Sequence, residues 1–303
     1  MEKKKSRLKT ALIKFNSYSI GERIVLILFF LFFVLEASFV IVPFLSVISN
    51  SLRTADAINL NPMGLPTSPR FINYVDVFTY PKGFYILGTV GYWQMFINSL
   101  WQTAVFLFVN LLSCSFIAYA LAKYRFPGRR ILYFVLIFTQ TIPIVGTGAA
   151  MFKHMVALNM YNNPATIWFS WGSGFDYSAF VMFGFFLGIS TSYMEAARID
   201  GANEMQIYFK VMLPQMLPCI IALMVTNFVG KWNDYTTSQI YLQDYPSLAY
   251  GLYLFRQKTS FGDNTKLGVY YAALVMTSIP GVLLYSTMQN FIIKNMTVGG
   301  LKG

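Results

Sequence analysis

The sequence predicts an all-α integral membrane protein with six membrane-spanning helices. Of its 303 residues, 56% are hydrophobic and only 12% are charged, and the mean hydropathy is +0.52. Soluble domains carry about twice that share of charge, and a chain this apolar has more hydrophobic surface than a water-facing globule buries. Its apolar runs are also long enough to cross a hydrocarbon core of about 30 Å, which takes roughly 20 helical residues.

Six apolar runs meet this length. The run nearest the N-terminus follows a basic arm and no small-residue cleavage site closes it, so we interpret it as a retained helix and not as a signal peptide. The fourth run is interrupted by residues 171–174 and by Asp176, a break that is tolerated at membrane depth only inside protein or beside a wet cavity. The predicted spans are Arg23–Ser49, Trp93–Ala122, Ile131–Phe152, Pro164–Ser190, Gln215–Tyr235 and Gly268–Ile293.

The distribution of Lys and Arg predicts the orientation. If the six helices alternate, fifteen of the 23 basic residues share one side, including the N-terminal arm and the C-terminal tail. Cytoplasmic loops collect Lys and Arg, so we expect both termini in the cytoplasm and external loops at Leu52–Tyr92 and near Gln239–Leu267. This pattern accounts for the net charge of +11 without nucleic-acid binding. We treat residues 1–303 as one domain.

Catalytic and metal-binding side chains are scarce. The chain has a single histidine, His154, and its two cysteines, Cys114 and Cys219, lie within or beside apolar runs, where we expect them to pack. No Gly-rich loop of the type that ends in Lys-Ser or Lys-Thr is present. We therefore expect neither an enzyme nor a metal site, and any ATP hydrolysis would belong to another chain.

The loop at residues 191–214 is the most informative segment. Ala196 and Ala197 favour a helix and leave room for close approach by another surface, Gly201 permits a bend, and Pro214 suits the first turn of the fifth span. Between residues 203 and 212, helical spacing predicts an apolar stripe that packs on something. Periodicity alone fits a partner protein, the membrane or the chain's own bundle equally well. The stripe consists of Met205, Tyr208, Phe209 and Met212.

The spacing in this loop resembles the defining loop of importer-type ABC transporter permeases. Glu195-Ala196-Ala197, three residues, Gly201, nine residues and then Val211-x-Leu213-Pro214 match that pattern, with Val211 where the family most often has Ile. Residues 96–100, 118–129, 232–235, 248–252 and 295–303 are similar to segments of carbohydrate permeases, the last to the tail of the second, smaller permease of maltose-type systems. The long first external loop and Lys231 depart from the family pattern.

This resemblance implies a type I ABC importer permease fold in a prokaryotic cytoplasmic membrane. It also implies a sister permease, two ATPase subunits that carry ATP and Mg²⁺, an extracellular solute-binding protein and a carbohydrate substrate, with no cofactor on this chain. Glu195 would contact an ATPase arginine, or Glu195 and Asp200 would simply pair with Arg198. The implied ATPase-coupling residues are Glu195, Ala196, Ala197, Asp200, Gly201, Met205, Tyr208, Leu213 and Pro214, with Gly299, Gly300 and Lys302 of the tail as a further contact.

Polar and aromatic side chains near membrane depth suggest a solute pathway. Aromatic faces stack on sugar rings, and Asn or Asp accepts hydroxyl hydrogen bonds. Trp168 fits an interfacial aromatic belt, Asp234 is spaced to pair with Lys231, and Glu36 is expected to face another protein surface. The pathway candidates are Trp171, Asp176, Trp232, Asn233 and Asp234.

Two alternatives remain open at this point. One is an ABC importer for a non-sugar solute such as a polyamine. The other is an ion-coupled secondary transporter, which would use Glu36 and Asp176 and would need no ATPase-binding loop.

Overall fold

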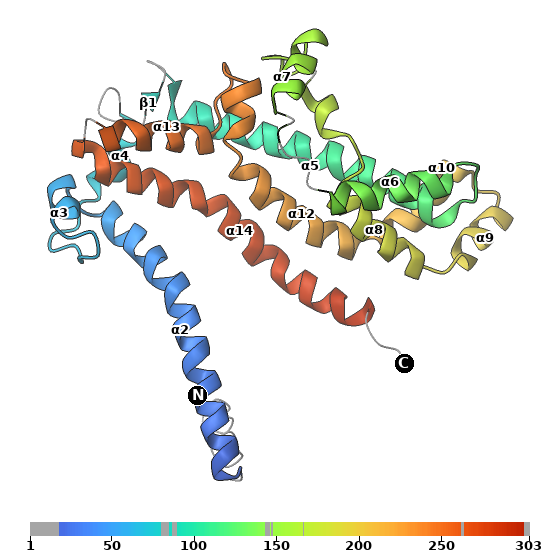
Figure 1. Ribbon diagram of the computed structural model, residues 1–303, viewed down its shortest axis with the longest axis horizontal. Helices are drawn as coiled ribbons and strands as arrows, with labels where there is room; N and C mark the ends of the chain where they lie inside the picture. Colours follow the sequence, from blue (N-terminus) through green and yellow to red (C-terminus); the bar gives the residue numbers. More distant parts are fainter. Residues whose placement is uncertain are drawn as a thin grey trace.

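The computed structural model describes residues 18–79, 85–86, 90–142, 146, 148–165, 167–261 and 264–299 (Figure 1). Within that part, three helices are each long and apolar enough to cross a membrane. They are α2 (Ile20–Ser51), α5 (Tyr92–Lys123) and α14 (Leu267–Gly299), whose apolar part runs to Gln289. The first, second and sixth predicted spans are thus confirmed as helices, each slightly longer than expected.

The fourth and fifth predicted spans each contain a helix that is joined to the loop between them by a sharp bend. Helix α8 (Tyr177–Gly188) continues into α9 (Ser192–Ile199) through a bend of 73°, and the helical segment 204–215 continues into α12 (Leu217–Trp232) through a bend of 72°. That segment comprises α10 (Glu204–Gln206), the π-helix η2 (Ile207–Met212) and α11 (Leu213–Gln215). The fifth span therefore begins at Leu217, after the bend, and Pro214 lies in the preceding helix and not at the start of the span.

The interruption expected in the fourth span is present. A short 3₁₀ helix, η1 (Ile167–Trp171), is followed by irregular backbone up to Asp176, and only then does α8 begin.

The third predicted span is not one helix. Helix α6 (Arg129–Thr141) ends at Thr141 and α7 (Gly148–Ala157) begins at Gly148. Ile142 has an extended backbone, with φ −98° and ψ 111°, as expected for a residue that precedes a proline, because the proline ring disfavours the helical region there. The prediction of a continuous helix over residues 131–152 is therefore wrong.

The remaining elements occupy the two predicted external loops. The first loop holds α3 (Ala55–Leu60), α4 (Ile72–Asp76) and an antiparallel pair of β1 (Tyr85–Ile86) and β2 (Val90–Gly91). The second holds the π-helix η3 (Thr237–Tyr241), α13 (Leu248–Phe261) and the 3₁₀ helix η4 (Asn264–Lys266).

A buried arginine organises the first loop. The Arg53 guanidinium donates to the carbonyl oxygens of Ala57 at 2.6 Å and Asn61 at 2.8 Å. The start of α14 lies against the same loop, because a Cβ on Gly268 would stand only 2.5 Å from the Arg53 carbonyl oxygen. Glycine at position 268 therefore permits this close packing of the last helix on the first loop.

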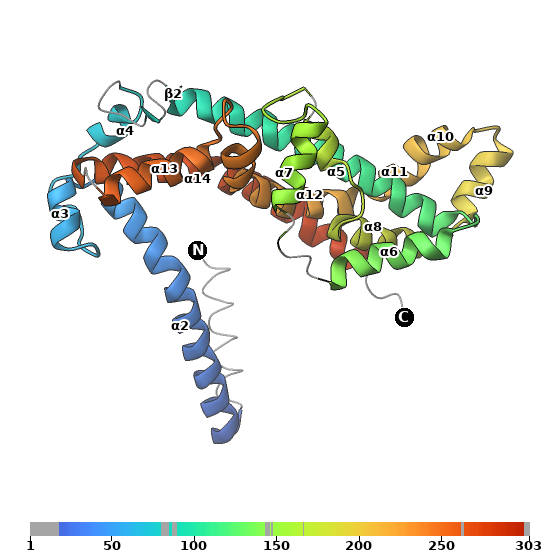
Figure 2. The ribbon, with the colours of Figure 1, turned by 45° about the horizontal axis from the view of Figure 1, so that its top comes forward.

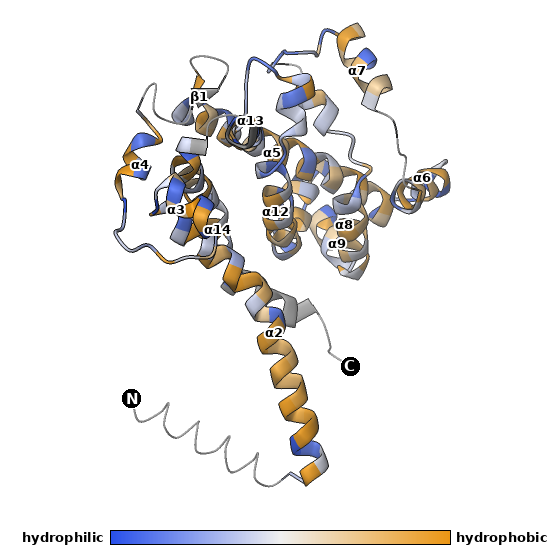
Figure 3. Ribbon diagram, turned by 60° about the vertical axis from the view of Figure 1, so that its left-hand side comes forward, coloured by the Kyte–Doolittle hydropathy of each residue, from blue (hydrophilic) through white to orange (hydrophobic). Residues whose placement is uncertain are grey.

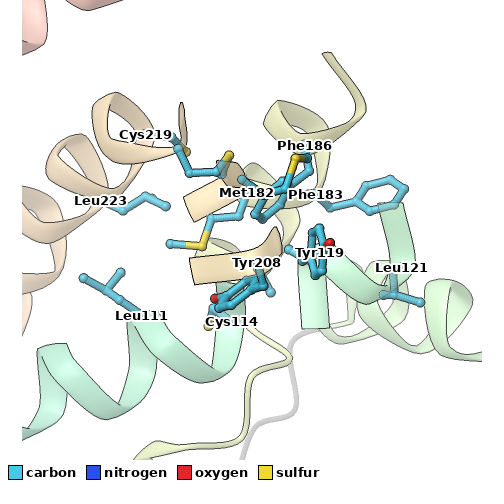
Figure 4. Close-up of a cluster of buried hydrophobic side chains, with 14 of the residues drawn as sticks. Leu111, Cys114, Tyr119, Leu121, Met182, Phe183, Phe186, Tyr208, Cys219 and Leu223 are labelled. Carbon is cyan, nitrogen blue, oxygen red and sulfur yellow. The ribbon is translucent and has the colours of Figure 1, made fainter. Parts of the chain in front are cut away.

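The main core lies where α5, α8, α12 and η2 meet (Figure 4). Both cysteines belong to it, which confirms that they are packing residues. The labelled members are Leu111, Cys114, Tyr119 and Leu121 of α5, Met182, Phe183 and Phe186 of α8, Tyr208 of η2, and Cys219 and Leu223 of α12.

Helix α2 stands apart from this core. It leaves the rest of the chain near α3 and is apolar over most of its length (Figure 3). Every residue from 24 to 45 is exposed, including Glu36. Within the chain, α2 contacts α14 and the loop that follows α2 itself. Most of this helix therefore has no protein neighbour in the described part of the chain.

Candidate functional site

Residues 192–215 form a hairpin, here called the 192–215 hairpin, that projects beyond the ends of α8 and α12 (Figure 2). Gly201 makes its turn with φ +81°, a left-handed conformation that favours glycine. On the return side, Asn203 caps α10. Its side chain accepts from the Gln206 amide at 2.9 Å, and the Gln206 side chain accepts from the Asn203 amide at 2.9 Å. The two expected short helices and the bend between them are confirmed.

The base of the hairpin is buried against α5. The Tyr208 ring stacks on Phe116 with 4.5 Å between centroids, and its hydroxyl donates to the Ser115 hydroxyl oxygen at 2.8 Å. Tyr208 is 1% exposed and Met212 is fully buried. Half of the predicted apolar stripe therefore packs on the chain's own bundle. The expectation that Tyr208 contacts a partner is corrected, because its ring has no free surface.

The tip of the hairpin is open. Ile199 is 86% exposed and Met205 59% exposed, and Phe209, which contacts Phe116 of α5, is also exposed. The Glu195 and Asp200 carboxylates make no hydrogen bond or ion pair with any residue that the structure describes. Of the other predicted residues, Ala196, Gly201 and Pro214 are exposed, while Ala197 and Leu213 are half-buried against the core.

Arg198 pairs across the turn with Glu204. The Arg198 Nε donates to Glu204 Oε1 at 2.9 Å, and the Tyr124 hydroxyl donates to the other carboxylate oxygen. The hydrogen bond from Arg198, followed in size by the one from Tyr124, holds the pKa of the Glu204 carboxyl below its ordinary value. Pairing of Arg198 with Glu195 or Asp200 is therefore wrong. Sequence reasoning missed Glu204, which comes next to Arg198 only through the Gly201 turn.

Asp176 lies at the centre of a polar cluster between α5, α8 and α12. One carboxylate oxygen accepts from the backbone amides of Ser178 at 2.8 Å and Ala179 at 3.3 Å, which caps α8, and the other accepts from Asn110 at 2.6 Å. The Asn227 amide donates to the Ser178 hydroxyl oxygen at 2.9 Å. Both carboxylate oxygens are thus satisfied within the chain. The signal available in the sequence was the presence of asparagines, Asn110 and Asn227 among them, within two apolar runs.

The expected pairing of Lys231 with Asp234 is confirmed, with 2.8 Å between Nζ and Oδ2. The Lys231 ammonium is almost fully buried and lies 4.6 Å from the centre of the Trp171 ring and 5.5 Å from that of Phe106. Thr237 also donates to Asp234 through its amide and its hydroxyl. Lysine 231 therefore occupies one face of Trp171.

Trp232 is an interior residue. It is 4% exposed, its Nε1 donates to the Thr277 carbonyl oxygen of α14 at 2.9 Å, and its ring stacks on Phe228. Its assignment to a solute pathway is corrected, because the side chain is buried, its Nε1 is hydrogen-bonded and its ring packs on other rings of the chain. Of the five pathway candidates only Asn233 has an exposed side chain.

Trp168 is half-buried and its ring stacks on Phe169. Gly299 is the last described residue, and Gly300 and Lys302 lie outside the described part of the chain. The described residues contain no group of three or more His, Cys, Asp or Glu that could hold a metal ion.

Comparisons with known proteins converge on one family. Residues 113–298 match the family described as binding-protein-dependent transport system inner membrane component. The chain is 30% identical over 278 residues to the arabinooligosaccharides transport system permease protein AraQ of Halalkalibacterium halodurans, covering 89% of this chain and 94% of that protein. It is 28% identical to the diacetylchitobiose uptake system permease protein NgcG of Streptomyces coelicolor, covering 88% and 85%.

A solved structure is also similar. A bacterial ABC transporter involved in the import of the acidic polysaccharide alginate matches with a TM-score of 0.73 at 26% identity, covering 90% of this chain and 98% of that one. The family match extends over more than half of the sequence and includes both arms of the 192–215 hairpin. The chain therefore belongs to the family of binding-protein-dependent transport system inner membrane components.

Proposed function

We propose that this chain is the permease subunit of an ATP-driven oligosaccharide importer, moved by a separate ATPase that grips the 192–215 hairpin. The observation that carries this proposal is the division of the hairpin into an open tip and a buried base. The tip offers exposed apolar side chains beside the unpaired carboxylates of Glu195 and Asp200, which suits a partner surface with an arginine. The base is fixed to α5 through Tyr208.

This division supports a mechanical role. A displacement of the tip reaches α5 through the buried Tyr208 contacts and reaches α12 through the helical segment 204–215. Packed interfaces switch between discrete arrangements and do not deform smoothly, so the push would alternate access between the two sides of the membrane. ATP and Mg²⁺ would bind to the partner ATPase, and residues 295–303 would make a second contact near it.

The topology is part of the proposal. Six spans with cytoplasmic termini place the hairpin in the cytoplasm, if α6 and α7 together form the third span. A sister permease would then cover the exposed surface of α2, and a solute-binding protein would dock on the external elements around α3, α4 and α13. The assembly would lie in the cytoplasmic membrane of a prokaryote.

The substrate class rests on the relatives. AraQ and NgcG are named for arabinooligosaccharides and diacetylchitobiose, and the maltodextrin transport system permease protein MalD of Streptococcus pneumoniae is 25% identical over 295 residues. Oligosaccharide is the chemistry common to the three names. Asn233 is the exposed polar side chain that we assign to the route of the solute.

Reconstitution tests the proposal directly. The chain would be purified with an ATPase, a sister permease and a binding protein encoded beside it, and placed in proteoliposomes. We expect binding protein loaded with one of a panel of oligosaccharides to stimulate ATP hydrolysis and sugar uptake together. Stimulation by a polyamine alone would reject the sugar assignment. Uptake that continues without ATP and follows an ion gradient would reject the importer itself.

A further inference from the structure

A cavity of 410 Å³ lies at the start of α6, where the chain turns out of α5. Its walls combine two arginines with aromatic rings, and no acidic residue lines it in the described part of the chain. The Tyr133 and Phe183 rings form one wall with 5.1 Å between their centroids. The lining residues are Phe126, Gly128, Arg129, Arg130, Tyr133 and Phe183.

The two guanidinium groups keep hydrogen-bond donors that no described residue accepts. Arg129 is half-buried and its Nε donates to the Leu121 carbonyl oxygen at 2.7 Å, which fixes the group while its terminal nitrogens have no partner among the described residues. The Arg130 guanidinium is exposed and lies 5.6 Å from the centre of the Phe134 ring, one turn further along α6. Two neighbouring positive charges with free donors, one of them fixed by a hydrogen bond, suit a phosphate group.

An apolar surface continues from these arginines along α6. Ile131, Phe134, Val135, Phe138 and Ile142 are between 41% and 69% exposed and recur at helical spacing. With other residues of the helix they line a second hollow of 450 Å³, and Phe134 joins it to Arg130. At 13 residues α6 is about 20 Å long, enough to span one leaflet of a core of about 30 Å.

We propose that this cavity and the adjoining surface of α6 bind one anionic glycerophospholipid. The phosphate would lie between Arg129 and Arg130, and an acyl chain would follow the apolar stripe. Basic pockets at membrane surfaces that adjoin apolar helices favour anionic headgroups. The site requires only that residues 129 and 130 lie at a membrane surface, where the apolar run of α5 ends, and it does not depend on the transported solute.

Native mass spectrometry of the delipidated chain, purified with the subunits that accompany it, tests the proposal. The probes are phosphatidylglycerol and phosphatidylcholine with the same acyl chains. We expect one phosphatidylglycerol to bind at least tenfold more tightly than phosphatidylcholine. The Arg130→Gln variant should lose that preference. The Arg125→Gln variant, which neutralises an exposed arginine outside the cavity, should keep it.

Two further measurements exclude other occupants of the cavity. Phe138→Gln, which leaves both arginines in place, should weaken phosphatidylglycerol binding, and inorganic phosphate should not displace the lipid. Equal binding of the two lipids by the wild-type chain would overturn the proposal. So would equal retention by Arg130→Gln and Arg125→Gln, displacement by inorganic phosphate, or a cross-link from position 130 to an acidic residue of a partner subunit.

Discussion

Gly201 illustrates how one residue can be required for its backbone alone. A Cβ at this position would meet no atom within 4 Å, so the space around it is open. Its φ of +81° nevertheless costs an L-residue roughly 1–2 kcal/mol. Any effect of substitution therefore comes from the shape of the turn and from what the new side chain presents to a partner, not from a clash within this chain.

We predict that Gly201→Asp abolishes transport while the protein still inserts in the membrane. Gly201→Asn is the matched control, because asparagine tolerates the left-handed region as well as aspartate does and adds no charge. It should retain more binding-protein-stimulated ATP hydrolysis than Gly201→Asp. Wild-type uptake in the Asp variant would remove the coupling assignment.

Tyr208 has the opposite character, since its contacts lie entirely inside the chain. Tyr208→Ala removes a buried ring and should cost about 3–5 kcal/mol. Tyr208→Phe loses only the hydrogen bond to Ser115, worth about 1 kcal/mol. We expect a large fall in the melting temperature of the detergent-solubilised protein for Ala and a small one for Phe. An equal fall for both would show that the ring contributes little.

In the 192–215 hairpin, the Arg198–Glu204 ion pair adds a side-chain link across the turn to the backbone hydrogen bonds there. Because the pKa of Glu204 is lowered in the folded chain, the stabilisation is fully present above the ordinary value of 4.5. It is lost as the pH falls through the lowered pKa and the carboxylate takes up a proton. The pair is exposed to solvent, so the hairpin itself, and not the whole bundle, should respond.

Hydrogen exchange of residues 192–206 measures this response. We predict faster exchange in Glu204→Gln than in the wild type at pH 7, with a difference that shrinks towards zero as the pH falls below 4.5. A difference that persists unchanged in acid would mean that the Arg198–Glu204 pair does not close the turn.

The start of α8 depends on Asp176 in a similar way. Asp176→Ala removes the helix cap and leaves Asn110 without its acceptor, so it should destabilise the chain by about 1–3 kcal/mol. Asp176→Asn can still cap α8, so it should be less destabilising than Asp176→Ala and should retain ATP-driven transport. Melting temperature and uptake are the two readouts. Loss of uptake without loss of stability in Asp176→Asn would favour an ion-coupled carboxylate and the secondary transporter.

At the scale of the whole molecule, α2 indicates that the chain does not function alone. Glu36 lies exposed in the middle of a helix whose central part is mainly apolar, and a carboxylate at membrane depth is costly when it faces lipid. We predict that Glu36→Lys reduces the amount of sister permease that copurifies with this chain, whereas Glu36→Gln has little effect. Unchanged recovery with both would place Glu36 away from the interface.

The sequence predicted the long helices well because apolar length is sufficient to define them, as α2, α5 and α14 show. It predicted the hairpin because small residues, one glycine and one proline stand at fixed spacing. It did not predict which side of the 203–212 stripe turns inward. Tyr208 and Met205 belong to the same apolar stripe, and only the packing on α5 makes one buried and the other exposed. The polar cluster around Asp176 was also hidden, because its partners come from three separate helices.

The packing of Gly268 on Arg53 also has a consequence for biogenesis. The carbonyl oxygen of Arg53 is synthesised about 215 positions before the glycine that lies against it. At 5–20 residues per second, translation takes on the order of 10 to 40 s to cover that distance. Throughout this interval the loop after α2 lacks the glycine that packs on it, so α14 completes a contact whose first half was made much earlier in synthesis.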